Sequence, residues 1–591
     1  MLVFDTEIYG NYFLVSFMDT DTKKIRHFEK YEGHSFDAQT VIKIMKSYTT
    51  VGFNSINFDL PVLYGALSDY SNEKLKELVD DIIVNRKPRY MIERDWGMRI
   101  PTNWDTIDLI EVAIGKASLK IYGGRMNAPK MQDLPIEPGQ ILTREEMIKI
   151  RDYCENDLHT TAMLYETLKP QIELRKSMSE QYGMDLRSKS DAQIAEAVIL
   201  GELEKITNKK YSRQEVDDGQ SFRFINPNII SFKSKELSEI FSKILKTKFT
   251  LGGNGSVVLP EWLKEQKIVI NKTEYTMGIG GLHSCEKAQY IKADDKHLLI
   301  DMDVASYYPN IILQQNLAPK SMGHYFLKVY QSIVNRRLKA KREGDKVTAD
   351  TLKICVNGSF GKLGSKYSTL YAPDLLIQTT ITGQLALLML IERIEDAGIT
   401  VVSANTDGIV MLCPIEKERD LEVVAFNWML DTSFELERTD YKAIASRDVN
   451  SYVAVKTDGK TKGKGVFAPS GLSKNPDFPI IYEAVAKLIA NDVPVEYTIT
   501  KCNDITKFVS VRRVQGGAVW RDEFLGKAVR FYQSSEVNSD ECIRYSKNSN
   551  KVPKSAGARP LMNLPDSFPS DVNYQFYIQE AEDLLKEVGY V

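Results

Sequence analysis

The sequence contains few cysteines, and their spacing excludes the usual uses of that residue. Its six cysteines are scattered over 591 residues, and no two stand as C-x-x-C. This excludes a zinc site seeded by such a pair and the disulfide framework of a small secreted protein. The pattern indicates a reducing compartment.

An excess of basic charge and a long apolar run are also missing. The formal net charge is −3, whereas nucleic-acid-binding domains more often carry a basic excess. The acidic residues Asp5 and Glu7 argue against a signal peptide. No uninterrupted apolar run is long enough to span a bilayer. We therefore expect an intracellular protein with no membrane partner.

The length and the local charge pattern permit several domains and a nucleic-acid channel. At 591 residues the chain is too long for one core, and roughly four domains are expected. Lysine and arginine cluster at 335–341, 362–366, 456–464 and 544–559. A basic channel is enough to bind phosphates. Each cluster taken singly is more simply a solvated surface.

The rest of the chain is organised around the stretch His297–Leu313, HLLIDMDVASYYPNIIL. Apolar residues alternate with Asp301 and Asp303, which predicts a buried strand carrying a carboxylate to its end. The second half resembles the first palm motif of family B DNA polymerases, D-x-x-S-L-Y-P-S-I-I. The matching residues are Asp303, Ser306, Tyr308, Pro309, Ile311 and Ile312. The alternative is that Asp303 caps a turn and the aromatic pair belongs to the core.

Two predicted helices, Tyr325–Glu343 and Val347–Phe360, are expected to form an antiparallel pair. The second resembles the K-x-x-x-N-S-x-Y-G fingers motif, although glycine and phenylalanine replace its serine and tyrosine. The first has the R-x-x-x-K spacing of the partner helix. The resemblance implies that five residues bind the incoming nucleotide: Arg337, Lys341, Lys353, Asn357 and Phe360. Basic residues on such a hairpin are otherwise commonly just solvated.

The segment Val401–Val410 is predicted to be a strand, a tight turn and a strand. It resembles the family's Y-G-D-T-D-S hairpin, with Asp407 at the second aspartate and Asn405 at the first. The resemblance implies that Asp303 and Asp407 hold two Mg²⁺ or Mn²⁺ ions, and that the backbone of Val304 completes the site. It also implies that the ring of Tyr308 lies under the deoxyribose and excludes a 2′ hydroxyl.

Two further segments match the family less closely. Asn450-Ser451-Tyr452 stands where the family often has K-x-Y, so Tyr452 keeps a primer contact while the lysine is lost. Gly278–His283 resembles the Y-x-G-G segment that helps to pass the primer end between sites. A plain glycine-rich turn is an equal interpretation of this segment.

The N-terminal strand predicts a second acidic site. Asp5 and Glu7 are two apart and face the same side of a strand. Two adjacent carboxylates are costly unless a cation lies between them. A solvent-facing strand is the alternative.

Two later segments match the motifs of proofreading exonucleases. Val51–Pro61 predicts a strand, a loop and a helix that begins at Asp59, and it resembles N-x-x-x-F-D. By that resemblance Asn54 contacts the primer strand and Asp59 binds metal. Tyr153 and Asp157 share a helix face and match Y-x-x-x-D, whose tyrosine positions the attacking water and whose aspartate binds metal.

Together the motifs imply a proofreading family B DNA polymerase of mixed α/β, multidomain fold. An RNase H-like exonuclease would hold two Mg²⁺ or Mn²⁺ ions through Asp5, Glu7, Asp59 and Asp157. A right-hand polymerase with an antiparallel palm, short helical fingers and a thumb would follow. The expected order is exonuclease 1–170, connecting region and start of palm 171–296, palm 297–320, fingers 321–366, palm 367–455, and thumb with the C-terminal region 456–591.

The resemblance also implies ligands, partners and a setting. Primer-template DNA and dNTPs are expected, together with a helicase, a primase, and a single-strand-binding or processivity factor. Because the exonuclease motif starts at once, we expect a compact bacteriophage-like enzyme in the cytoplasm of a bacterium or of an infected cell. The rival hypotheses are an exonuclease whose polymerase module has decayed into a DNA-binding module, and a structural replisome component. Retention of Asp303, Lys353, Asn357 and Asp407 argues against both.

Overall fold

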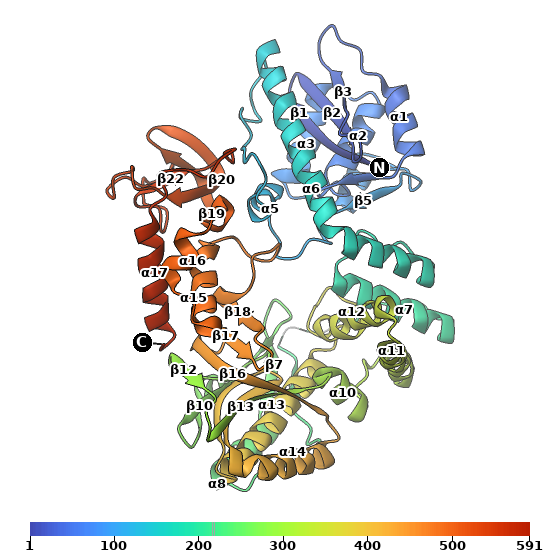
Figure 1. Ribbon diagram of the computed structural model, residues 1–591. Helices are drawn as coiled ribbons and strands as arrows, with labels where there is room; N and C mark the ends of the chain where they lie inside the picture. Colours follow the sequence, from blue (N-terminus) through green and yellow to red (C-terminus); the bar gives the residue numbers. More distant parts are fainter. Residues whose placement is uncertain (216, 218, 591) are drawn as a thin grey trace. The chain divides into compact units, whose positions relative to one another are not determined.

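The chain folds into two compact units in the computed structural model, which describes residues 1–215, 217 and 219–590 (Figure 1). The first unit contains Met1–Ser190, Ser470–Ile480 and Cys502–Tyr577. The second contains Asp191–Pro469, Ile481–Lys501 and the chain from Ile578 onward. Both units are therefore assembled from separate stretches of sequence. The six expected domains are a finer division and stay predictions.

The N-terminal part of the first unit is built on a five-stranded sheet with the strand order β3-β2-β1-β4-β5. Its first three strands are antiparallel, and β4 and β5 run parallel to β1. The strands are β1 (Leu2–Tyr9), β2 (Tyr12–Asp19), β3 (Ile25–Lys30), β4 (Thr50–Gly52) and β5 (Thr106–Asp108). This is the arrangement that the expected RNase H-like fold requires.

Six helices accompany this sheet, and the last is the longest of them. They are α1 (Ala38–Ser47), α2 (Asp59–Leu67), α3 (Asn72–Ile83), α4 (Arg89–Asp95), α5 (Leu119–Arg125) and α6 (Arg144–Tyr182). α6 begins at a capping box of Thr143 and Glu146, and it ends at Gly183, which has a φ of 67°. The boundary expected at residue 170 lies inside α6, because its buried face continues through Ile172.

A second, antiparallel sheet completes the first unit. Its order is β21-β19-β20-β22, with β19 (Val509–Trp520), β20 (Glu523–Gln533), β21 (Arg544–Tyr545) and β22 (Ala558–Pro560). Val511 and Ala528 pack against Ile121 and Met131. Part of the region expected to be the thumb thus folds with the N-terminal segment, and its role as a thumb stays a prediction.

The second unit is centred on a ten-stranded antiparallel sheet, which confirms an antiparallel palm. Nine strands follow the order β18-β17-β16-β13-β15-β14-β11-β10-β9, and β12 pairs with β16. They are β9 (Ile268–Ile270), β10 (Thr273–Met277), β11 (Leu282–Ser284), β12 (Gln289–Lys292), β13 (His297–Val304), β14 (Thr400–Asn405), β15 (Gly408–Pro414), β16 (Leu436–Asp448), β17 (Ser451–Lys456) and β18 (Thr461–Lys464). A smaller sheet contains β6 (Ser221–Arg223), β7 (Lys248–Leu251) and β8 (Val257–Val258).

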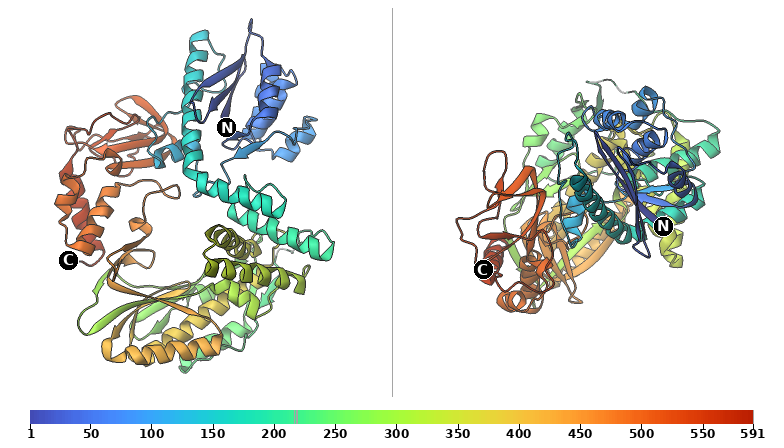
Figure 2. Two further views of the ribbon diagram at one scale, coloured as in Figure 1. Left: turned by 45° about the vertical axis from the view of Figure 1, so that its right-hand side comes forward. Right: turned by 90° about the horizontal axis from the view of Figure 1, so that it is seen from above.

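Two helices cover one face of the large sheet, namely α13 (Pro373–Asp396) and α14 (Glu418–Thr432) (Figure 2). Ile300 and Met302 of β13 share a core with Leu388 of α13 and Trp428 of α14. α13 is long and apolar enough to cross a membrane, but 83% of its most apolar window is buried inside this unit. This burial is what a core helix shows, and a core helix can have the same apolar composition.

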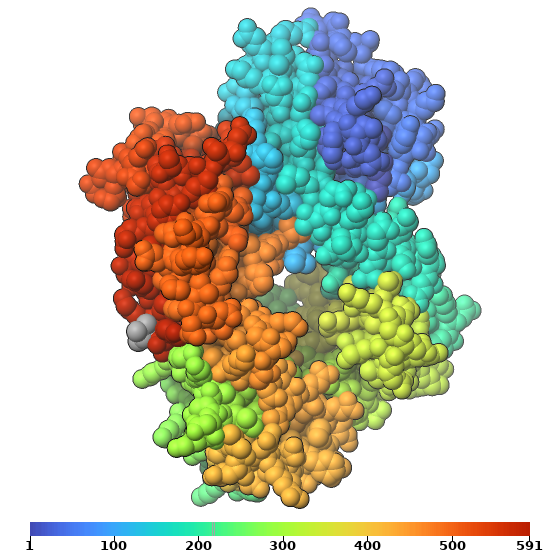
Figure 3. Space-filling model, viewed as in Figure 1, coloured from blue at the N-terminus to red at the C-terminus, as the bar shows by residue number. Residues whose placement is uncertain are grey.

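The expected fingers are a helical hairpin of α11 (His324–Glu343) and α12 (Lys346–Leu363). α11 ends at Gly344 with a φ of 73°, and the Asp345 carboxylate accepts from the Thr348 N–H at the start of α12. The hairpin packs with α7 (Asp191–Thr207), and Figure 3 shows their surfaces side by side. The remaining helices are α8 (Lys235–Lys246), α9 (Glu261–Glu265), α10 (Tyr307–Gln314), α15 (Pro479–Asn491), α16 (Val495–Thr500) and α17 (Tyr574–Glu587).

Candidate active sites

Three elements of the first unit bring the four expected carboxylates together. Asp5 and Glu7 project from β1, Asp59 is the first residue of α2, and Asp157 lies in α6. Ligand atoms of Asp5, Glu7 and Cys154 all lie within 4.8 Å of one another. This group of acids was expected from the motifs, whereas the thiol of Cys154 was not.

Burial and mutual repulsion raise the pKa values of these carboxylates. Burial, then Asp59 and Glu7, raise the pKa of Asp5 well above its ordinary value. Burial raises the pKa of Asp59 to about 7 and that of Asp157 to about 6, against hydrogen bonds that lower both values. A divalent cation would relieve this repulsion, and the mainly oxygen ligands suit Mg²⁺ or Mn²⁺. The residues therefore fit the implied metal site.

Tyr153 and Lys120 form one side of this site. The Tyr153 hydroxyl bonds to Asp157, and this hydrogen bond lowers the pKa of Asp157. The Lys120 ammonium lies 5.4 Å from the centre of the Tyr153 ring and pairs with Asp133. Burial, then Asp157 and Asp59, raise the pKa of Glu7 well above its ordinary value, and Lys120 opposes that rise. The sequence analysis missed Lys120, because the residue belongs to no recognised motif and reaches the acids only through the packing of α5.

The loop that carries Asn54 is held by a buried carboxylate. Asp108, which is 2% exposed, accepts from the N–H groups of Asn54 at 2.8 Å, Ile56 at 2.9 Å and Ile110 at 3.1 Å. Asn54 itself has a φ of 61°, a conformation that asparagine tolerates better than most residues. Asp108 thus fixes the backbone between β4 and α2, where the primer-strand contact is expected.

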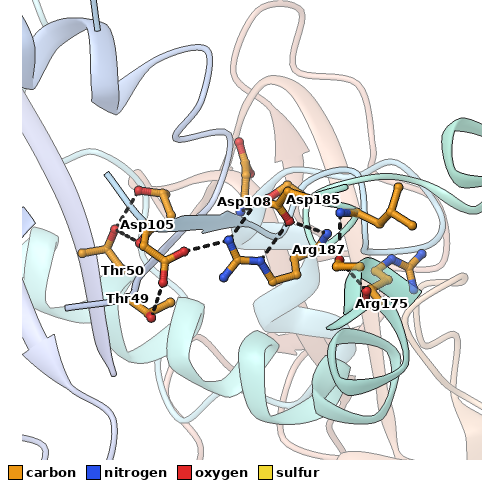
Figure 4. Close-up of polar contacts among 11 residues, drawn as sticks. Thr49, Thr50, Asp105, Asp108, Arg175, Asp185 and Arg187 are labelled. Atoms are coloured by element: carbon orange, nitrogen blue, oxygen red, sulfur yellow. Dashed lines mark hydrogen bonds and ion pairs between the residues drawn. The ribbon is translucent and has the colours of Figure 1, made fainter. Parts of the chain in front are cut away.

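Asp105, the residue before β5, makes contacts of its own. Figure 4 shows Arg187 lying between Asp105 and Asp185. Asp105 accepts from the Thr49 hydroxyl at 2.5 Å and lies 2.7 Å from the Arg187 guanidinium. The Asp108 N–H donates to Ser188 at 2.9 Å. β5 is thereby tied to the segment that follows α6.

In the second unit, two adjacent strands bring Asp303 and Asp407 together. Asp303 lies opposite Gly408 in the β13–β15 pair, and the Val304 N–H donates to the Asp407 carbonyl at 2.7 Å. Thr406, with a φ of 61°, allows the tight turn before Asp407. Burial, together with repulsion from neighbouring acids, raises the pKa of Asp303 to about 6. Burial also raises the pKa of Asp407.

Beside Asp407 lies a cavity of about 280 Å³ that most of the expected nucleotide-binding residues line. The lining residues are Ser306, Tyr307, Tyr308, Pro309, Arg337, Asn357, Phe360 and Asp407. The Arg337 guanidinium donates to the Ser306 hydroxyl at 3.4 Å. Lys341 and Lys353 are exposed and do not line this cavity. The structure thus gathers three of the five expected residues of the fingers helices.

Phe360 stacks on Tyr308 inside this cavity. The two ring centres are 4.3 Å apart with an interplanar angle of 26°. Phenylalanine at this position therefore contributes an aromatic face, and that face lies against Tyr308.

A second polar group adjoins Asp303 on the sheet. The buried Asp301 accepts from the Tyr441 hydroxyl at 2.5 Å and lies 3.2 Å from the Lys462 ammonium. Lys462 also bonds to Tyr452, the expected primer contact. The sequence analysis did not identify Lys462 as a site residue, because its strand is joined to β13 only through β16 and β17.

The two asparagines that depart from the family motifs contact each other. The Asn405 amide donates to the Asn450 side-chain oxygen at 3.2 Å and to the Val449 carbonyl at 3.0 Å. Where the motifs have an aspartate and a lysine, this chain has two neutral amides joined by a hydrogen bond. The local charge balance is the same in both cases.

Comparison with known proteins finds similarity to archaeal proteins named DNA polymerase 1. No family model matches the chain. It is 22% identical over 514 residues to DNA polymerase 1 of Pyrococcus abyssi, a match covering 76% of this chain and 62% of that protein. It is 28% identical over 158 residues to DNA polymerase 1 of Sulfolobus acidocaldarius, covering 25% of this chain and 17% of that one.

A solved structure shows a weaker likeness. The family B DNA polymerase from the hyperthermophilic archaeon Pyrobaculum calidifontis aligns with a TM-score of 0.43 at 14% identity, covering 100% of this chain and 78% of that chain. The chain spans less than two thirds of the length of the Pyrococcus abyssi and Sulfolobus acidocaldarius relatives.

Proposed function

We propose that the chain is a family B DNA polymerase, which extends a primer along a DNA template and removes 3′ nucleotides at a separate site. One observation carries the polymerase activity. Asp303 and the turn of Asp407 meet beside a cavity that Tyr308, Arg337 and residues of α12 line. This is the arrangement that nucleotidyl transfer needs.

At the polymerase site the side chains position the reactants. Asp303 and Asp407 would hold two Mg²⁺ ions, and such ions would supply charge that favours ionisation of the primer hydroxyl and offsets the charge of the triphosphate. Arg337 lies in the cavity with its guanidinium beside Ser306, where it would bind phosphate oxygens. Tyr308 would lie under the deoxyribose and exclude a 2′ hydroxyl.

At the exonuclease site Asp5, Glu7, Asp59 and Asp157 would hold two ions of the same kind. Tyr153 bonds to Asp157, and its phenol would orient the water that attacks the phosphodiester. The Lys120 cation adds positive charge on the same side, which favours the phosphate of a primer end. Support for the exonuclease comes from this convergence of acids.

The rival hypothesis of a decayed polymerase rested on Asn405 and Asn450. The two amides hydrogen-bond to each other at 3.2 Å, so each has a partner in the structure. Asp303 also lies opposite Gly408, the residue after Asp407, in the β13–β15 pair. This favours a working polymerase site.

The test is primer extension with labelled DNA and Mg²⁺, with and without dNTPs. Asp407→Ala should reduce incorporation by about a thousandfold or more while leaving 3′-to-5′ degradation intact. Asp5→Ala combined with Glu7→Ala should do the reverse. Near-normal extension by Asp407→Ala would overturn the polymerase assignment. Degradation at the wild-type rate by the double variant would overturn the exonuclease assignment.

The biological setting belongs to the same proposal. The chain would act with a helicase, a primase, and a single-strand-binding or processivity factor, in a bacterial or phage-infected cytoplasm. The bacteriophage-like character also stays a proposal.

A further inference from the structure

A glycine-rich turn, Gly278–Gly281, joins β10 to β11 beside the polymerase cavity. Its Gly280 carbonyl accepts a hydrogen bond of 2.6 Å from the Tyr308 hydroxyl. The face of the Tyr308 ring stacks on Phe360. The ring is therefore held at its face by the fingers and at its hydroxyl by this turn.

The turn is anchored to the core by Gln384, which is 1% exposed in α13. The Gln384 side-chain oxygen accepts from the Gly278 N–H at 3.1 Å, and its amide nitrogen donates to the Gly278 carbonyl at 2.9 Å. Both ends of the amide thus bind the backbone of one residue. Because α13 is almost wholly buried, packing fixes the position of this amide.

The other end of the turn lies against the hairpin of Asp407. The Thr406 N–H donates to the Leu282 carbonyl at 2.8 Å. A Cβ atom on Gly281 would lie only 2.9 Å from the Thr406 hydroxyl. The turn is therefore held on one side by α13 and on the other by the hairpin of Asp407. Its Gly280 carbonyl, which accepts from the Tyr308 hydroxyl, is thereby fixed in position.

We propose that Gln384 is a positioning residue for sugar selection. Its amide holds Gly278, and the same turn holds the Tyr308 hydroxyl through the Gly280 carbonyl. The ring then stays where a 2′ hydroxyl would collide with it. The inference rests on the proposed function of Tyr308 at the polymerase site. It assigns a specific role to the Gly278–Gly281 turn.

The same helix supplies a matched control residue. Gln378, also buried, accepts from the Ile225 N–H at 2.9 Å and donates to the Ile225 carbonyl at 2.8 Å. Neither Gln378 nor Ile225 lines the cavity. Gln378→Met therefore removes an equivalent pair of hydrogen bonds without touching Tyr308.

The experiment measures kcat/KM for a dNTP and the matching rNTP in single-nucleotide insertion. Gln384→Met should lower dNTP over rNTP selectivity about tenfold, whereas Gln378→Met should change it less than about twofold. Tyr308→Phe removes the hydroxyl and should also lower selectivity. Gln384→Met added to Tyr308→Phe should cause no further loss, because both act through one contact.

Equal selectivity losses in the two glutamine variants would overturn the inference, as would full additivity with Tyr308→Phe. Thermal unfolding checks whether Gln384→Met folds. If it does not, the same selectivity measurement is made on Gln384→Glu, which keeps the oxygen that accepts from the Gly278 N–H and loses the N–H that donates to the Gly278 carbonyl. Tyr308→Ala separates the two claims. If it relaxes selectivity and neither Gln384 variant does, only the inference fails. If it leaves selectivity unchanged, the steric role of Tyr308 fails as well.

Discussion

Asn405 and Asn450 form a neutral pair between the catalytic hairpin and the start of β17. Asn405→Asp alone would place a further negative charge near Asp303 and Asp407, where burial and acidic neighbours already disfavour ionisation. We expect incorporation to fall about tenfold. Adding Asn450→Lys should restore most of it by pairing the new charge. Single-nucleotide insertion kinetics measure both effects, and a double variant no better than the single one would contradict the paired reading.

A second prediction at the scale of single residues concerns Asp108. Asp108→Asn would turn an N–H group toward one of the three backbone donors that the carboxylate accepts, at a cost of about 1–3 kcal/mol. We expect the KM for single-stranded DNA in excision to rise several-fold, since the Asn54 loop would shift, while nucleotide insertion stays unchanged. Asp105→Asn is the control, because it weakens the contacts with Thr49 and Arg187 at the residue just before β5. An equal KM change in both variants would indicate general loosening of β5.

At the scale of elements, motifs and local chemistry predicted much of what the structure contains. The strand carrying Asp303, the helix beginning at Asp59 and the hairpin turning at Gly344 were all expected, because each is specified by neighbouring residues. Lys120 and Lys462 were missed because tertiary packing alone brings them to the acids. Val511 packs against Ile121 and Met131 of the N-terminal segment, but the sequence analysis assigned it only by its position in the chain.

At the scale of the whole molecule, the acidic sites should link stability to pH and to metal. The raised pKa values of Asp59, about 7, and Asp157, about 6, mean that the folded state disfavours their ionised forms. Without metal, their contribution to stability is full below their ordinary pKa of 3.8, and it is lost progressively as pH rises from there to about 7. The melting temperature should therefore fall over that range, and Mg²⁺ should raise it more at pH 8 than at pH 5.5. Asp59→Asn is the control. Its melting temperature, measured by thermal unfolding, should depend less on pH than that of the wild-type protein.

The spacing of the palm motifs leads to a prediction about priming. Between Asp303 and Lys353 the structure places α10, α11 and the first part of α12, and between Lys353 and Asp407 it places the rest of α12, α13 and β14. Protein-primed phage enzymes carry insertions in these intervals. We expect this enzyme to extend a nucleic-acid primer and to need partner proteins for long products. Full-length synthesis on a singly primed circle, from single binding events without partners, would contradict this.

Because the first unit consists of separate stretches of sequence, it cannot fold completely until its last stretch has been synthesised. The Arg530 guanidinium donates to the Ala128 carbonyl across 402 positions of sequence. At ordinary rates of translation those residues emerge roughly 20 to 80 seconds apart. During that interval Ile121 and Met131 of the nascent chain lack their partners Val511 and Ala528 and expose apolar surface. The N-terminal segment is the first part of its unit to be synthesised, yet that unit is complete only after Cys502–Tyr577 has been made.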